Sequence, residues 1–276
     1  MAQGKVDDIT ASDLLEYVET QDDFAFELEV YRIADELGLS PKHAWTYADP
    51  QTNKMRQFDI QARASIGNKR IQLAVECKSL KPSYPLLVLR VPRPVSDSFH
   101  DLIYSDGVPS ELHQYQYARH RRTPGGYSLY PPGDLVGKSM RQVKRVNEHL
   151  MAGDDVFDKW MQAAASAGDL ITEAIEYHKP NRSDHPMTFV VPLLAVSDGA
   201  LWAADFDEAG NLDREPKQVE EVTFFIGRDY SYPKVNITYT ISHLHICTKT
   251  RVRGFLRQMT FEDNPFWLTA FPVHPG

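Results

Sequence analysis

Three charged residues in two neighbouring apolar segments have the types and spacing needed to hydrolyse a phosphodiester. Asp59 lies in one apolar run, and Glu76 and Lys78 flank Cys77 in the next. Two carboxylates can bind Mg²⁺, and a lysine beside them adds a positive charge or a general base. This combination indicates metal-dependent cleavage of a phosphate ester.

A predicted β-hairpin brings these residues together. The turn cluster Gly67-Asn68-Lys69 separates two strand-like stretches, residues 56–64 and 70–78. A hairpin centred between Gly67 and Asn68 places Asp59 opposite Glu76. Because alternate side chains of a strand share a face, Glu76 and Lys78 are expected to point to one side and Cys77 to the other.

Length and composition are those of a globular protein with one large domain or two small ones. The chain has 276 residues, of which 42% are hydrophobic and 25% charged. No apolar stretch approaches the ~20 residues of a membrane span, and the first residues lack the apolar core of a signal peptide. The two cysteines, Cys77 and Cys247, are read as small core residues, and a cytoplasmic location is expected.

The charge distribution indicates one basic strip on an acidic body. The net charge is −8, yet residues 112–147 contain seven basic side chains and a single acid, Asp134. Such a strip is compatible with phosphate binding, and a solvated helix face plus a loop explains it equally well. The seven basic residues are Arg119, Arg121, Arg122, Lys138, Arg141, Lys144 and Arg145.

A long insertion rich in Pro, Gly, Tyr and His is expected between residues 96 and 137. Loops of this length are usually functional or disordered. Tyrosines among the basic residues could stack on bases, although aromatic anchoring of the loop is the favoured interpretation. These tyrosines are Tyr104, Tyr115, Tyr117, Tyr127 and Tyr130.

Periodicity and turn signals predict an α/β protein whose mixed central sheet is flanked by helices. Asp198-Gly199 is a strong turn signal and predicts a hairpin between the strands on either side of it. Helices are expected from Ser12 onward and over 23–37, 110–122, 138–151, 155–178 and 252–259. Strands are expected over 44–47, 56–64, 70–78, 86–91, 187–197, 200–205, 219–226 and 235–248.

Three segments in order resemble the PD-(D/E)XK, or restriction-endonuclease-like, nuclease superfamily. They are a helix bearing Glu, a strand bearing Asp and a strand bearing Glu-x-Lys, and together with a later helix they span about a third of the chain. The matching residues are Phe26-Glu27-x-x-Val30-x-x-Ile33-x-x-x-Leu37-Gly38, Arg56-Gln57-Phe58-Asp59-Ile60 and Val75-Glu76-Cys77-Lys78. Phe58 stands where the motif name has Pro, which removes no chemistry.

The resemblance implies a role for each matched position. Asp59 and Glu76 would bind one divalent metal, Mg²⁺ or Mn²⁺, with the backbone carbonyl of Cys77 completing the site. Lys78 would position or deprotonate the attacking water, or stabilise charge on the phosphate. Glu27 would assist, through a second metal or a metal-bound water. Glu29 competes for this role, but Glu27 flanks the buried stripe of the helix more closely and is preferred.

Ser139-x-x-Gln142 lies at the start of the expected basic helix. It resembles the Gln-bearing helix that follows the third strand in several branches of the nuclease superfamily. Gln142 would orient the lysine or the scissile phosphate, and an ordinary surface amide is an equal alternative. The basic side chains of the same helix would contact the nucleic-acid backbone. They are Lys138, Arg141, Lys144 and Arg145.

Two further clusters are given structural interpretations. His243 and His245 share a strand face and could bind a metal, but no third ligand is evident. The acidic segment 205–211 looks superficially like a calcium loop, yet it lacks the terminal Glu spacing and is read as a hairpin loop.

The resemblance thus implies a restriction-endonuclease-like domain over 1–276, with a core at 12–151, the insertion at 96–137 and an α/β extension at 152–276. The expected function is metal-dependent cleavage of nucleic acid in defence or DNA processing. DNA is favoured over RNA as partner, a homodimer is left open, and no membrane is involved. The alternative is a non-catalytic nucleic-acid- or protein-binding member of the same fold that acts as a complex subunit.

Overall fold

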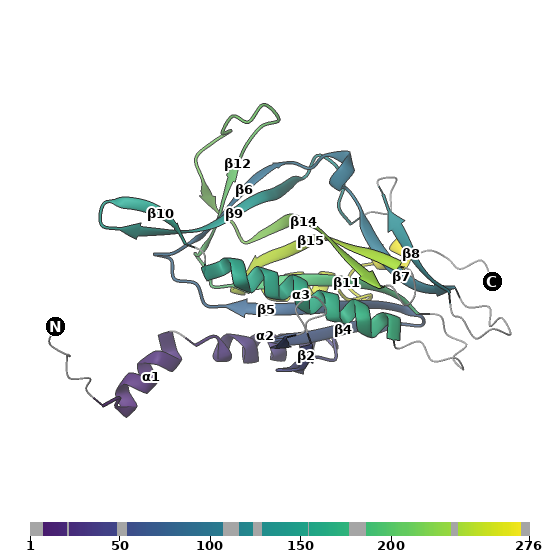
Figure 1. The fold of residues 1–276 in the computed structure, drawn as a ribbon, viewed down its shortest axis with the longest axis horizontal. Coiled ribbons are helices and arrows are strands. Elements are labelled where there is room, and N and C mark those ends of the chain that lie inside the picture. The colour runs from purple at the N-terminus through teal and green to yellow at the C-terminus, as the bar shows by residue number, and fades with distance from the viewer. Residues whose placement is uncertain are drawn as a thin grey trace.

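The computed structural model describes residues 8–20, 22–48, 54–106, 116–123, 129–153, 155–176, 186–232 and 237–271. Within these ranges the chain is a mixed α/β protein. One thirteen-stranded sheet runs through the molecule, and helices cover both of its faces (Figure 1). None of the described helices is long and apolar enough to cross a membrane.

The helices form where apolar stripes meet the sheet. Phe26, Val30 and Ile33 are the buried stripe of α2, and Gly38, with a φ of +71°, follows its end. Thr10 and Asp13 exchange hydrogen bonds in a cap at the start of α1. The helices are α1 (Ala11–Thr20), α2 (Phe24–Glu36), α3 (Asp155–Glu176), α4 (Lys249–Gln258), α5 (Phe266–Ala270) and the 3-10 helix η1 (Val95–Asp97).

The strands divide into the large sheet and a two-stranded sheet made of β2 and β3. The large sheet has the order β1-β4-β5-β11-β15-β14-β9-β6-β12-β13, with β10, β7 and β8 attached at its sides. The first strands are β1 (Lys42–His43), β2 (Thr46–Ala48), β3 (Met55–Gln57), β4 (Ile60–Ile66), β5 (Lys69–Lys78), β6 (Leu86–Pro92), β7 (His100–Asp106) and β8 (Gln116–Arg122). The remaining strands are β9 (Leu135–Val146), β10 (His149–Gly153), β11 (Met187–Val196), β12 (Leu201–Asp205), β13 (Lys217–Gln218), β14 (Glu221–Tyr232) and β15 (Ile237–Thr248).

The centre of the sheet is parallel and fully buried. Strand β11 lies between β5 and β15 and runs parallel to both. Every residue of β11 is buried, as expected for a parallel strand with both faces covered. Helix α3 packs on one face of β5 and β11, and α2 and α4 contribute to the core on the other face. The second half of the chain therefore supplies two of the central strands.

The predicted hairpin has the predicted register. Ile60 pairs with Val75 and Ile66 with Lys69, the register expected for a hairpin centred between Gly67 and Asn68. The pairing ends at Ile60, and Asp59 lies in a bend just before it. The structure also confirms the helices expected over 23–37, 155–178 and 252–259, and the strand expected over 86–91. These elements have strong local periodicity, so the sequence alone predicts them.

Two predicted helices are wrong. Residues 138–151 form most of β9 and the first part of β10, because Met140 and Gln142 are buried in a strand-like pattern and β9 pairs with β6. Residues 116–122 form β8, paired with β7, and residues 110–115 lie outside the described ranges. In both segments pairing with a neighbouring strand determines the conformation.

Two strand predictions also need correction. Strands β11 and β12 flank the Asp198-Gly199 turn but pair with other strands, so they are not a hairpin. The strand expected over 56–64 breaks at Phe58 and Asp59 into β3 and β4. There the backbone bonds to a different segment, since Phe58 N–H donates to the Trp45 carbonyl and Ala44 N–H to the Asp59 carbonyl.

Replacing Gly168 with alanine is expected to destabilise the chain by about 1–2 kcal/mol. A Cβ at this position of α3 would overlap a ring carbon of Tyr230. The Tyr230 hydroxyl donates to the Ala164 carbonyl, so the buried ring cannot withdraw. Overpacking then outweighs the gain of roughly 1 kcal/mol in helix propensity. Urea unfolding measures the change.

Gly153→Ala is the matched control for this prediction. Its added Cβ would meet nothing closer than 3.6 Å, so little change in stability is expected. Equal stability of Gly168→Ala and the wild type would show that the packing between α3 and Tyr230 is loose.

Candidate metal and nucleic-acid site

The structure places the Asp59 carboxylate against the backbone of β5. Its Oδ2 accepts a hydrogen bond of 2.8 Å from the Cys77 N–H. Asp59 is 8% exposed and stands at the bend just before β4. The Asp59 carboxylate thus accepts the hydrogen bond that a backbone carbonyl of the neighbouring strand would otherwise accept, at the point where the β4–β5 pairing ends.

Glu76 lies on the face of β5 that α3 covers, and it has no exposed surface. The Ser166 hydroxyl of α3 donates to Glu76 Oε1 at 3.0 Å, and it lies 3.1 Å from the Tyr47 hydroxyl. A buried carboxylate needs such polar partners, because an unsatisfied one costs several kcal/mol. The acid therefore sits in a polar recess within an otherwise apolar layer.

Four carboxylates surround the end of β5. Burial is the main reason that the pKa of the Cys77 thiol lies well above its ordinary value, and four acids add to the shift. They are Asp59, Glu27, Glu76 and Asp23. The thiol is buried and protonated, which agrees with its interpretation as a core residue, and Cys247 is likewise buried.

Lys78 forms an ion pair that the sequence did not predict. Its Nζ lies 2.9 Å from Asp23 Oδ2, and Asp23 Oδ1 accepts a bond of 2.6 Å from the Ser79 N–H. Asp23 directly precedes α2, a position where acids are common because they stabilise the helix N-terminus. This position is the only sequence signal for Asp23, and it does not predict the contact with Lys78. The lysine is 28% exposed and therefore accessible to a ligand.

The two glutamates of α2 face different neighbours. Glu27 Oε2 lies 2.9 Å from His43 Nε2 and is 16% exposed, close to the end of β5. Glu29 pairs with Lys249 of α4 at 2.5 Å. Glu27 thus lies near enough to act electrostatically on Cys77, whereas Glu29 is paired with α4.

The donor chemistry of this cluster fits Mg²⁺ or Mn²⁺. Asp59, Glu76 and the Cys77 carbonyl are oxygen ligands, the type that hard divalent cations prefer. Within the described ranges no three His, Cys, Asp or Glu side chains stand close enough together to hold a metal. Mg²⁺ does not require three, because it keeps several waters and binds through one or two carboxylates.

A pocket of about 400 Å³ opens beside Lys78. We call it the lysine pocket, because three lysines line it: Lys78, Lys81 and Lys144. Neither Lys81 nor Lys144 forms an ion pair with an acid in the described part of the chain. The other lining residues are Ser79, Leu80, Tyr84, Gln142 and Gly153.

Gln142 holds the rim of this pocket and does not lie on a helix. It belongs to β9, is 9% exposed, and its Nε2 donates to the Tyr84 carbonyl at 3.1 Å. The expectation that it lies on a basic helix is therefore wrong. Its amide fixes the turn 81–84. Arg141 donates to the neighbouring Met140 carbonyl, and Arg145 lies on the same strand.

The predicted basic residues of β8 lie far from the acids. Strand β7, which pairs with β8, joins the start of β11 at Thr188, whereas Glu76 lies beside Leu194 near its end. Six residues of strand separate these points by about 20 Å. Figure 1 shows β7 and β8 at the right and β10 at the left.

Structural contacts occupy three of the predicted basic side chains: Arg121, Arg122 and Lys138. Arg121 forms a bidentate pair with the buried Asp101, at 2.8 and 3.1 Å, which raises the pKa of Arg121. Arg122 donates to the Ala270 carbonyl, and Lys138 pairs with Asp97. The Arg119 side chain lies outside the described residues, as do Tyr115, Tyr127 and the Tyr117 side chain.

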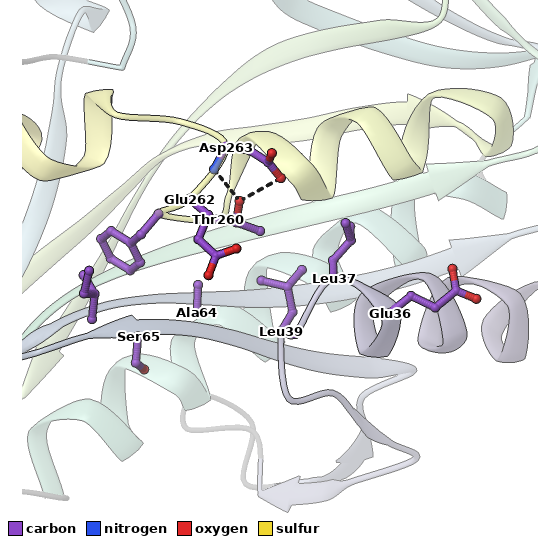
Figure 2. A pocket seen from close by; sticks show the side chains of 11 residues that line it. Glu36, Leu37, Leu39, Ala64, Ser65, Thr260, Glu262 and Asp263 are labelled. Carbon is purple, nitrogen blue, oxygen red and sulfur yellow. Dashed lines mark hydrogen bonds between the residues drawn. The ribbon is translucent and has the colours of Figure 1, made fainter.

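A larger pocket, of about 510 Å³, lies between the end of α2 and the segment after α4 (Figure 2). Its charged lining is acidic: Glu36, Glu262 and Asp263. Glu36 is held by Arg253 at 2.6 Å, and Asp263 accepts from the Thr260 hydroxyl at 3.3 Å. Such a surface repels phosphate, so the smaller lysine pocket is the better nucleic-acid site.

The pair His243 and His245, interpreted from the sequence as structural, is buried in the core. His243 stacks on Tyr130 with ring centres 3.7 Å apart, and the Tyr130 hydroxyl lies 2.9 Å from His245 Nε2. Burial, with a smaller effect of Arg93, lowers the pKa of His243 to about 2 and that of His245 to about 3. Both imidazoles are therefore neutral core side chains.

The acidic segment 205–211 is a hairpin turn, as predicted. Asp207 Oδ1 accepts from the Asn211 N–H at 2.8 Å, and Phe206 forms a bridge with Leu212. Asp205 pairs with Arg90 at 2.7 Å. These contacts use the carboxylates within the fold.

No protein-family model, curated protein or solved structure matches this chain. Its function is therefore inferred from its own residues and their geometry.

Proposed function

We propose that the chain is a divalent-metal-dependent nuclease of the restriction-endonuclease-like type, with DNA as the favoured substrate. One observation carries the proposal: at the end of β5, Asp59 bonds the Cys77 backbone next to Glu76, and the following residue, Lys78, lines the lysine pocket. The order of a Glu-bearing helix, an Asp-bearing segment and a Glu-x-Lys strand supports it, since the predicted hairpin register is present.

Asp59, Glu76 and the Cys77 carbonyl would hold the metal, which supplies positive charge to the scissile phosphate when bound. Lys78 would approach the phosphate or the attacking water as charge develops. Lys78 is 28% exposed, so a phosphate can reach its ammonium group and compete with the Asp23 carboxylate for it. Glu27 would orient its neighbours through His43.

A second function, binding without cleavage, is favoured by a different observation. Glu76 has no exposed surface, Asp59 bonds the backbone of β5, and Lys78 already has an acidic partner. Each contact gives these residues a structural role that needs no metal. A subunit that binds nucleic acid through the lysine pocket would keep the same arrangement.

A cleavage assay with labelled DNA separates the two functions. The wild type is expected to cleave in Mg²⁺ or Mn²⁺ and to stop when EDTA removes the metal. Lys78→Ala and Asp59→Ala are each expected to lose about 100-fold or more in rate. Arg214→Ala, at an exposed site, is the control with unchanged rate.

Equal rates for the wild type, Lys78→Ala and Asp59→Ala would contradict the nuclease proposal. Absence of metal-dependent cleavage on single-stranded DNA, duplex DNA and RNA would leave the binding function as the better account. Circular dichroism of each variant verifies that the fold is kept.

A further inference from the structure

We propose that the lysine pocket binds one unpaired nucleotide, with its phosphates on Lys81 and Lys144 and its base on Tyr84. The substrate class is therefore DNA with a single-stranded segment: a free strand, a frayed end or a flap. The inference deepens the proposed function, since it assigns a substrate to the site beside the acid cluster.

Charge in the pocket favours a phosphate. Lys144 is half-buried, and neither it nor Lys81 pairs with an acid among the described residues. Two unneutralised ammonium groups in one small concavity create a local positive potential on a chain whose net charge is −8. An anion that enters would gain more there than on an open surface, because the walls exclude part of the solvent.

Tyr84 provides an aromatic surface at the same rim. It is 41% exposed although it lines the pocket, so one part of the side chain is open to a ligand. The backbone beneath it is held on both sides, by the bond of 2.8 Å from Tyr84 N–H to the Lys81 carbonyl and by the Gln142 amide. The fixed backbone keeps the exposed ring at the rim of the pocket, and stacking of a base on such a ring contributes roughly 1–3 kcal/mol per base.

The size of the pocket selects an unpaired nucleotide. A volume of about 400 Å³ is at the lower end of small-ligand sites and much too small to enclose a base pair with both backbones. A paired nucleotide would first have to leave the stack, which costs a few kcal/mol. Strands that already present an unpaired nucleotide avoid this cost and should bind more tightly.

Lys78 connects the pocket to the acid cluster. It lines the pocket, and it follows Glu76 by two residues on the same face of β5. A strand with one nucleotide in the pocket therefore presents a neighbouring phosphate to Lys78 and to the carboxylates behind it. The pocket would set which phosphodiester is cut.

The test is direct binding in EDTA, where no cleavage occurs. Fluorescence anisotropy compares a labelled single-stranded oligonucleotide with a blunt duplex of the same sequence. The single strand is expected to bind at least about 10-fold more tightly, because it pays no unstacking cost. Tyr84→Ala should weaken its binding by about 5- to 100-fold, and Tyr84→Phe, which keeps the ring, should bind like the wild type.

The double variant Lys81→Ala/Lys144→Ala tests the role of the two ammonium groups. It should weaken binding and reduce the salt dependence, by about 0.7 in the log–log slope for each phosphate that is no longer neutralised. Arg214→Ala/Lys217→Ala, which also removes two positive charges but outside the pocket, is the control for a general change in charge. Circular dichroism and thermal unfolding confirm that each variant is folded.

Three results would overturn the inference: duplex binding as tight as single-strand binding, no effect of Tyr84→Ala, or equal decreases in affinity for the lysine-pocket variant and Arg214→Ala/Lys217→Ala. Because binding is measured without metal, its outcome is independent of cleavage. A chain that binds the single strand as described but never cuts it would refute the nuclease and retain the pocket assignment.

Discussion

Replacing Glu76 with glutamine is expected to lower the rate of metal-dependent cleavage by about 100-fold or more while the chain stays folded. Glutamine has the same shape and can still accept the hydrogen bond from Ser166. It carries no negative charge, however, and is a poorer ligand for Mg²⁺ than a carboxylate. Single-turnover cleavage at saturating protein measures the effect on the chemical step.

Ser166→Ala distinguishes loss of chemistry from loss of structure. It removes the donor to a buried carboxylate and should cost about 1–3 kcal/mol of stability. Because the carboxylate remains, saturating Mg²⁺ should restore most of the cleavage. If Glu76→Gln cleaves as fast as the wild type, Glu76 is a structural acid and is not a ligand of the catalytic metal.

Below about pH 6.5 the free energy of unfolding is expected to fall steeply because of two buried histidines. The folded chain keeps His243 and His245 neutral, with pKa values lowered to about 2 and about 3. In the unfolded chain both titrate near an ordinary pKa of about 6.5. The unfolded state therefore binds up to two more protons between about pH 3 and pH 6.5.

The sign of the effect follows from this difference. Stability from the two neutral imidazoles is fully present above the unfolded pKa and is lost as the pH falls through the window. Each histidine contributes a slope of about 1.4 kcal/mol per pH unit, so together they contribute up to about 3 kcal/mol per unit. The groups nearby that oppose protonation of His243 are Arg93, His245, Lys138 and His100.

Urea unfolding at about pH 7, 6 and 5 measures this slope. His243→Gln and His245→Gln will each lower stability at every pH, so the readout is the slope of stability against pH and not its level. Each variant should lose about half of the histidine contribution to the slope of unfolding free energy against pH. The contribution of the carboxylates to this slope is the same in all variants. His149→Gln, at an exposed site on β10, is the control; a wild-type slope in both core variants would contradict the prediction.

Local patterns predicted the parts of the fold that depend on near neighbours in the sequence. The turn at Gly67-Asn68 sets the register of β4 and β5, because a hairpin turn and the strand period leave little freedom. The helix α2 follows from its apolar stripe and its glycine stop. The same hairpin spacing predicts that Asp59 lies close to Glu76.

Other features depend on residues far apart in the chain, and no local pattern could predict them. Residues 138–151 have polar and apolar positions that suit a helix or a strand, and pairing with β6 selects the strand. The same pairing carries Gln142 and Lys144 to the turn at Tyr84, which creates the lysine pocket. Asp23 meets Lys78 across 55 residues.

The amino-acid sequence by itself determined the hairpin, its register and the identity of the acids and the lysine upon it, because turn geometry and side-chain alternation act over a few residues. Only the tertiary structure decided what those groups touch: Ser166 on Glu76, Asp23 on Lys78, and a pocket closed by strands from distant segments. Long-range packing made these choices, since burial and strand pairing outweigh local preference wherever a segment fits two conformations.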